Sequence, residues 1–197
     1  MAFLYTEQYA SPLGEITLSC DGEAITGLWF DGQKYFGATL PAKGVSTAVV
    51  PSEHPVLKPN GHPQLAPNGH PVLEDARRWL DLYFSGQEPD FLPPLRYSTT
   101  PFRKAVWDIL LSIPYGETMT YGQIATLIAE QQGLEKMSAQ AVGSAVGHNP
   151  IALMIPCHRV VGAGGNLTGY AGGLDRKLKL LELEKVDISH FFMPAAR

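Results

Sequence analysis

A cysteine and a histidine stand side by side in the run Ile155-Pro156-Cys157-His158-Arg159-Val160-Val161. The thiolate form of cysteine is a strong nucleophile, and an imidazole placed next to it can accept the thiol proton. The β-branched residues around the pair favour a buried strand. A buried cysteine is otherwise an inert small hydrophobe. The run by itself therefore leaves two interpretations open, an ordinary core cysteine and an activated nucleophile.

Length and composition limit the classes of protein that this chain can belong to. Its 197 residues are enough for one large domain or two small ones. No stretch reaches the ~18–20 apolar residues of a membrane span, and the N-terminus lacks the pattern of a secretory signal. Cys20 and Cys157 lie far apart and form no CxxC pair. We therefore expect a cytoplasmic protein without membrane association, structural zinc or cofactor, although the spacing alone permits one disulfide.

Charge is distributed unevenly along the chain. The net charge of −4 is unusual for a nucleic-acid binder, but residues 1–95 carry 5 Lys/Arg against 11 Asp/Glu, whereas residues 96–197 carry 10 against 8. The two parts thus have net charges of −6 and +2. Since acidic surfaces repel phosphates, only the second part is expected to touch nucleic acid.

The first part reads as strands followed by a helix. Strands are predicted over Gly14–Cys20 and Ala24–Phe30, joined by a hairpin turn at Asp21-Gly22. A helix is predicted over Val72–Phe84, because its apolar residues have helical spacing and Ser85-Gly86 follows.

An eight-residue repeat separates these elements and places a His-Pro pair at His54, His62 and His70. Evenly spaced histidines could bind a metal, but the proline and glycine content favours a loop. We interpret this Pro/His repeat loop at 54–73 as a duplicated, functionally neutral insertion.

The run Pro89–Pro94 marks a boundary after which the chain becomes helical. We place domains at residues 1–95 and 96–190, with a tail at 191–197. Helices are predicted over 101–111, capped by Thr100, and over about 120–131 and 138–147, the last capped by Ser138. The last two resemble a helix-turn-helix. Many residues of the third helix are Ala, Gly or Ser, which allows another helix or DNA to approach its backbone closely.

Several motifs of the second part together resemble one known family. They are the run 155–162, Asn149-Pro150, Tyr170-Ala171-Gly172-Gly173, the segment 180–184, and the upstream segments 101–107 and 113–121. They are similar to the active domain of methylated-DNA–protein-cysteine methyltransferases, the O6-alkylguanine-DNA alkyltransferases. The likeness covers about residues 100–186, and the Pro-Cys-His-Arg signature is highly specific.

The resemblance implies an α+β or α/β fold class. The implied protein has an N-terminal ribonuclease-H-like β-sheet domain and a C-terminal, mainly helical domain. The second domain carries a helix-turn-helix and the active-site cysteine. The N-terminal part fits this companion domain only loosely, by its length and by strands that precede a helix.

The resemblance also implies a chemistry for the cysteine. Family members transfer an alkyl group from O6 of guanine to their own cysteine, once and without turnover. Cys157 would be the acceptor and needs an anionic sulfur, His158 would draw its proton through a bound water, and Glu184 would orient the imidazole. Asn149 would be the hinge between recognition helix and active-site strand, with its side chain bonded to backbone. A helix C-cap is a compatible structural interpretation for this asparagine.

A guanine stacked in duplex DNA must be rotated out before its O6 can react. By resemblance Tyr121 would crowd the target phosphate, and Tyr170 would contact the base and donate a hydrogen bond to its oxygen. Val160, Ala171 and Gly172 would form the remaining pocket wall. Either tyrosine taken alone is more typical of a half-buried core residue.

The expected DNA contacts include one departure from the family. Gln140 stands where family members often have an intercalating arginine, with Ala139 and Gly143 on the same helix. We therefore predict retained activity with weaker, less salt-sensitive DNA binding than an arginine would give. The other cations expected nearby are Arg103, Lys104, Lys136 and Arg159. For Arg159 a structural salt bridge is at least as well supported as a phosphate contact.

The implied partner is double-stranded DNA containing O6-alkylguanine, bound by a monomer. Two alternatives remain open. A non-catalytic binder of alkylated bases with the same fold typically has tryptophan in place of the acceptor cysteine, so the presence of Cys157 argues against it. A cysteine hydrolase would need His158 to reach the neighbouring sulfur, and adjacent residues in a strand point to opposite faces.

Overall fold

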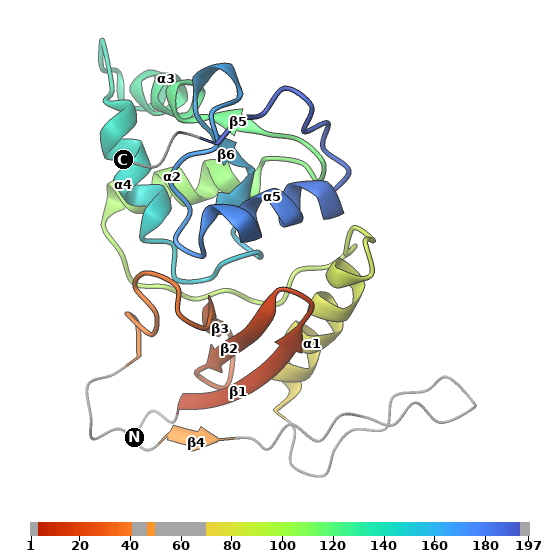
Figure 1. The fold of residues 1–197 in the computed structure, drawn as a ribbon. Helices are drawn as coiled ribbons and strands as arrows, with labels where there is room; N and C mark the ends of the chain where they lie inside the picture. The colour runs from red at the N-terminus through yellow and green to blue at the C-terminus, as the bar shows by residue number, and fades with distance from the viewer. Residues whose placement is uncertain (1–3, 41–46, 50–69, 194–197) are drawn as a thin grey trace.

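The computed structural model describes residues 4–40, 47–49 and 70–193 (Figure 1). Its N-terminal layer is a four-stranded sheet, in which β1 (Leu4–Ser11), β2 (Gly14–Cys20), β3 (Ile25–Phe30) and β4 (Thr47–Val49) have the order β3-β2-β1-β4. Neighbouring strands pair antiparallel, except that β1 and β4 are parallel. The predicted hairpin of β2 and β3 is confirmed. Asp21 stabilises its turn by accepting from the backbone N–H groups of Glu23 and Ala24, both at 3.0 Å.

Helix α1 (Pro71–Phe84) covers this sheet and confirms the helix predicted over 72–84. Its buried face includes Leu73, Ala76, Leu80 and Tyr83, which recur every three or four residues. The helix begins at Pro71, where a proline lacks only an N–H that has no partner in the first turn. Of the histidine repeat, residues 54–69 lie outside the described residues.

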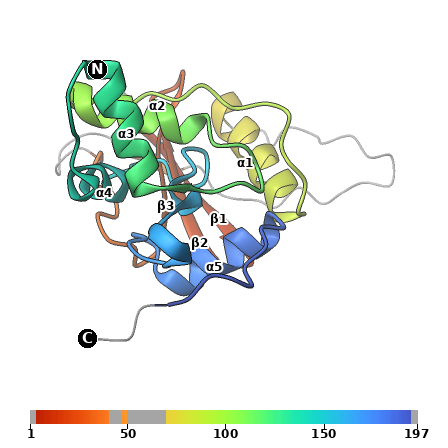
Figure 2. The same cartoon turned by 90° about the horizontal axis from the view of Figure 1, so that it is seen from above.

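The second layer holds the remaining helices. They are α2 (Pro101–Leu111), α3 (Tyr121–Gln132), α4 (Ala139–Gly147) and α5 (Leu174–Leu183), with short 3-10 turns η1 (Cys157–Arg159) and η2 (Ala163–Gly165). A two-stranded parallel sheet pairs β5 (Met119–Thr120) with β6 (Val160–Val161). Viewed from above, these helices overlie the N-terminal strands (Figure 2). No helix of the described segments combines the length and apolar character needed to cross a membrane.

Local capping explains where the predicted helices begin. The hydroxyl of Thr100 accepts from Arg103 N–H at 3.3 Å, and that of Ser138 accepts from Ala141 N–H at 3.3 Å. Helix α3 starts with a capping box between Thr120 and Gln123 and ends at Gly133, which has a φ of 63°. The three helical predictions for this region are confirmed to within a residue or so.

The segment around the cysteine is not the strand that its sequence favoured. Cys157 to Arg159 form the turn η1, and only Val160–Val161 pair as a strand. Pro156 has no N–H to contribute to a ladder, and its carbonyl accepts from Arg159 N–H at 3.0 Å, which closes the turn. The apolar residues before the cysteine reflect burial on all sides rather than strand pairing, since Ile155 is fully buried.

The two layers share backbone hydrogen bonds as well as a continuous core. The N–H of Leu28 in β3 donates to Pro150 O at 2.9 Å, and Ala152 N–H donates to Leu28 O at 3.0 Å. The backbone that follows Asn149 therefore extends the N-terminal sheet beyond β3. In the tail, Phe192 pairs with η2, because its N–H donates to Gly165 O at 3.1 Å.

Candidate active site

Cys157 lies on η1 with 5% of its surface exposed. Burial raises the pKa of its thiol above the usual 9.0, while Asn149 and the charge of Lys177 act in the opposite direction. The raised pKa favours the neutral thiol at rest, in keeping with the expectation that His158 draws off its proton. Negative charge on this sulfur has to be generated when the substrate is in place.

A buried ion and hydrogen-bond cluster holds the neighbouring histidine. Glu184 Oε1 lies 2.6 Å from His158 Nε2 and accepts from the hydroxyl of Tyr83 at 2.8 Å. Its Oε2 accepts from Arg159 Nε at 2.8 Å and from the Gly116 N–H at 3.3 Å. Burial alone would raise the pKa of Glu184, but His158 and Arg159 lower it to about 2. Glu184 is thus an ionised carboxylate that can only accept hydrogen bonds.

That carboxylate determines the state of the imidazole. Burial lowers the pKa of His158 below the usual 6.5, although Glu184 opposes this effect. A neutral imidazole with Nε2–H donated to Glu184 has its lone pair on Nδ1. This buried Nδ1 has no hydrogen-bond partner among the described residues. The predicted orientation of His158 by Glu184 is present in the structure, and Nδ1 is the atom that can accept a proton.

Asn149 ties two backbone segments together beside the cysteine. Its Nδ2 donates to Ile155 O at 2.7 Å, and its Oδ1 accepts from Ile151 N–H at 3.0 Å. These contacts match the expected bonding of a hinge to backbone. The alternative of a helix C-cap is wrong, because the cap of α4 is His148.

The two tyrosines of the expected base pocket differ in their hydrogen bonding. The Tyr121 hydroxyl donates to Thr168 O at 3.1 Å and to Gly169 O at 3.0 Å, which fixes its ring against the loop before Tyr170. The buried hydroxyl of Tyr170 has no partner among the described residues. Burial raises its pKa well above the usual 10.0, with the Cys157 charge adding to the effect. Tyr170 therefore stays protonated and has a hydrogen bond to give.

One cavity of about 680 Å³ brings together most of the residues expected to contact substrate or DNA. Those that line it are Tyr121, Ala139, Gln140, Gly143, Tyr170 and Ala171. Val160 and Gly172 are buried and do not line it, nor do Arg103 and Lys104. Lys104 instead pairs with Asp108 at 2.8 Å.

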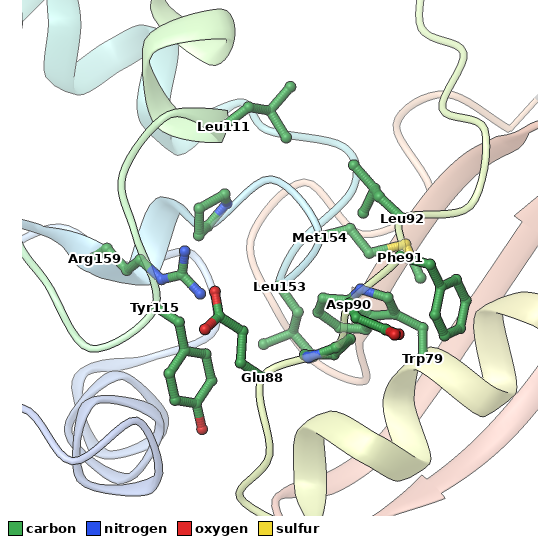
Figure 3. Close-up of a pocket in the computed structure, with 12 residues that line it drawn as sticks. Trp79, Glu88, Asp90, Phe91, Leu92, Leu111, Tyr115, Leu153, Met154 and Arg159 are labelled. Carbon is green, nitrogen blue, oxygen red and sulfur yellow. The ribbon is translucent and has the colours of Figure 1, made fainter.

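A second cavity of about 530 Å³ lies beside Pro156 and Arg159 (Figure 3). It is lined from α1, the segment 88–92 and Tyr115, and by none of the residues predicted to contact the base. Arg159 lines this second cavity. Besides its ion pair with Glu184, its guanidinium donates to Ile113 O at 2.6 Å. This arrangement supports the structural role that the sequence offered for Arg159.

Comparison with known proteins follows the same division of the chain. The family model for the DNA-binding domain of 6-O-methylguanine DNA methyltransferase matches residues 101–186, and that for its ribonuclease-like domain matches residues 4–97. The chain belongs to this family. Its architecture is accordingly the family's ribonuclease-like domain followed by a DNA-binding helical domain.

Individual relatives agree with the family assignment. A Mycobacterium leprae methylated-DNA–protein-cysteine methyltransferase is 42% identical over 178 residues, which cover 89% of this chain and 88% of the relative. For the protein of that name from Mycobacterium bovis, 53% identity extends over 106 residues, or 54% of this chain and 61% of the relative. The crystal structure of Mycobacterium tuberculosis OGT in complex with DNA matches with a TM-score of 0.70 at 39% identity, covering 92% of this chain and 93% of that one.

The sequence analysis did not name two residues that lie close to the candidate site of this family member. Tyr83 reaches Glu184 from helix α1, and the fully buried Lys177 donates its ammonium to the carbonyls of Val160 and Thr168. Burial lowers the pKa of Lys177 to about 8, and the nearby Cys157 opposes this shift. The sequence did contain a signal for Lys177. This lysine lies three residues before Leu180 on the apolar face of α5, and a lysine on a buried face needs hydrogen-bond partners inside the protein.

The sequence analysis expected no structural zinc because Cys20 and Cys157 lie far apart and form no CxxC pair, and the structure adds one neighbour to Cys20. The sulfur of Cys20 lies 3.8 Å from His70 Nδ1. Two side chains still fall short of the four ligands of a structural zinc site. Within the described segments, no group of three or more His, Cys, Asp or Glu is placed to hold a metal ion.

Proposed function

We propose that this protein reverses alkylation damage directly, by transferring the alkyl group of O6-alkylguanine in DNA to Cys157 in a single turnover. The observation that carries the proposal is the buried Cys157-His158 pair with Glu184 ionised behind the imidazole. It supplies an acceptor sulfur, a neutral base and a group that orients the base. Relatives of this chain carry the name of that activity.

The proposed reaction starts from the neutral thiol. His158 Nδ1 takes the thiol proton through a water, and the imidazolium is stabilised by Glu184 at 2.6 Å. The sulfur then attacks the alkyl carbon, so that an S–C bond forms while the C–O6 bond breaks and its electron pair stays on guanine. Tyr170 donates a hydrogen bond to the departing guanine, since its hydroxyl is protonated and has no partner among the described residues. Each alkylated sulfur is a stable thioether, which explains why one turnover is expected.

We propose that the target nucleotide enters the 680 Å³ cavity after rotation out of the duplex. Helix α4 would contact the DNA with Ala139, Gln140 and Gly143, all of which line that cavity. Arg103 and Lys104 would contact phosphates farther along the duplex. The proposal includes a monomer acting in the cytoplasm, and two reduced, widely separated cysteines are consistent with that compartment.

Intact-mass spectrometry tests the proposal. Incubation with duplex DNA carrying O6-methylguanine should add about 14 Da once per chain, the mass of one methylene. The addition should be lost in Cys157→Ser and kept in Cys20→Ser, which removes the other thiol. Binding without any mass gain would instead indicate a non-catalytic lesion binder. Turnover of an ester or amide would indicate a cysteine hydrolase.

A further inference from the structure

The proposed base cavity is not built by the helical domain alone. The segment after β3, coloured orange in Figure 1, reaches the C-terminal domain below α4 and contributes Lys34 and Tyr35 to the cavity lining. The backbone N–H of Lys34 donates to Ala171 O at 2.9 Å, so the segment is bonded directly to the loop that carries Tyr170.

Tyr35 is held in an unfavourable backbone conformation without being buried. Its φ is 63°, a left-handed value that costs free energy for a non-glycine residue, and its side chain is 40% exposed. Its ring stacks on that of His148, with centroids 4.2 Å apart and planes inclined by 24°. His148 is in turn fixed at the end of α4, where its Nδ1 lies 2.7 Å from Ser144 O. The stack therefore connects the N-terminal domain to the recognition helix.

Lys34 is the one lysine or arginine among the described residues that line the cavity. Helix α4 carries no lysine or arginine, and Gln140 is neutral. Lys34 is exposed and makes no ion pair within the described part of the chain, unlike Lys104. Its ammonium lies 5.0 Å from the centre of the Tyr35 ring. An exposed, unpaired ammonium beside a DNA-facing cavity has the chemistry to bind a phosphate.

We propose that Lys34 is a DNA-phosphate contact supplied by the N-terminal domain, and that Tyr35, stacked on His148, is the residue that positions it. The inference rests on the proposed function and adds a contact that compensates for the neutral Gln140. It also revises the expectation that the acidic first part of the chain stays away from DNA, because the local charge at Lys34 differs from the domain average.

Salt dependence of binding tests the phosphate contact. Lys34→Gln should weaken binding to lesion-containing duplex and lower the slope of log affinity against log salt concentration by about 0.9, the value for one lost phosphate contact. The matched control is Lys179→Gln, which removes an exposed lysine of α5 that does not line the cavity, and its slope should equal that of the unmodified protein. An unchanged slope in Lys34→Gln would overturn the proposal.

Coupling between the two residues tests the positioning role. Tyr35→Gly removes the ring and relieves the left-handed strain, so the fold should persist while the salt slope falls as in Lys34→Gln. Tyr35→Phe should keep the slope, because it keeps the stacked ring. The double variant Lys34→Gln/Tyr35→Gly should lose no more affinity than Lys34→Gln alone, and additive losses would exclude positioning.

The free base O6-benzylguanine separates failure of this inference from failure of the proposed function. It has no phosphate, so the unmodified protein should transfer its benzyl group to Cys157 whatever the salt slopes of the Lys34 variants. If the unmodified protein gains no mass from base or duplex, the proposed function fails. If only the salt slopes fail to differ, Lys34 is not a phosphate contact and the repair proposal stands.

Discussion

Burial sets the resting charge of the two reacting side chains. It raises the pKa of the Cys157 thiol and lowers that of the His158 imidazole, so both groups are neutral near neutral pH. Glu184, in contrast, is charged at neutral pH, because its hydrogen bonds and its ion pair with Arg159 stabilise the carboxylate. A neutral acid next to a neutral base avoids storing an unpaired buried charge before substrate arrives.

These shifts predict the pH dependence of alkyl transfer. A histidine pKa depressed below 6.5 means that His158 remains a competent base until the pH falls below that value. The rate constant for transfer from free O6-benzylguanine should therefore be maintained down to pH 6.5 and decline only at more acidic values. Rates measured across this range by intact mass would check it. An acid limb with its midpoint above 6.5 would show that the base is not a buried, neutral His158.

Gly143 lies inside helix α4, where glycine lowers helix stability, and the proposed function places this residue against DNA. A methyl group added at Gly143 would lie 3.7 Å from the Tyr121 ring, an ordinary van der Waals contact. Gly143→Ala should therefore raise the free energy of unfolding by up to about 1 kcal/mol through helix propensity. It should also weaken DNA binding, because Gly143 lines the cavity at the helix surface.

Chemical unfolding and duplex titration would measure the two effects of Gly143→Ala separately. Gly122→Ala provides the control, since its added methyl meets only the Thr120 hydroxyl at 3.9 Å and its position is outside the cavity lining. That variant should keep DNA affinity while gaining a smaller amount of stability near the helix start. Equal DNA affinity in both variants would mean that the Gly143 surface does not face the duplex.

Local signals predicted most of the elements. Caps at Thr100 and Ser138 and the glycine at the end of α3 determine where helices begin and end, and each acts within a few residues. The turn η1 was missed because the β-branched flanks of Cys157 are buried for tertiary reasons and only Pro156 argued against a strand. Strand β1 was not predicted either. Its interior Glu7 pairs with Arg77 of helix α1, a partner that lies far along the chain.

The candidate site likewise combines residues that sequence motifs predict with residues that only folding brings close. Family motifs predicted Cys157, His158 and Glu184, and the geometry places the Glu184 carboxylate 2.6 Å from the imidazole of His158. Tyr83 and Lys34 come from the N-terminal domain and join the site only through folding, so no spacing in the sequence points to them.

The two domains are bonded to each other through backbone segments that also carry residues of the candidate site. Strand β3 is bonded to the backbone after Asn149 through Leu28, and to the interdomain segment through Ile25, whose N–H donates to Pro94 O at 2.7 Å. The backbone that follows Asn149 is therefore bonded to the edge of the N-terminal sheet. Movement of the N-terminal domain would carry the active-site backbone with it.

Arg176 joins several of these parts. From α5 its guanidinium donates to Leu13 O at 2.9 Å, Gly172 O at 3.1 Å and Asp31 O at 3.3 Å. It also lies over the Phe30 ring, 5.0 Å from the centroid. Two turns of the N-terminal sheet are thereby tied to the loop that follows Tyr170.

Arg176→Met should loosen this junction while keeping most of the apolar stem. Loss of three hydrogen bonds from a charged donor, partly offset by solvent, is expected to cost about 1–3 kcal/mol of unfolding free energy. Arg78→Met, which breaks an exposed pair with Asp75 and a cation–π contact with the Phe91 ring, should cost no more than about 1 kcal/mol. Urea unfolding would measure both. Because Asp31 begins the segment that carries Lys34, Arg176→Met should also lower the salt slope of DNA binding; a destabilised variant with an unchanged slope would mean that this segment is held by Tyr35 and His148 alone.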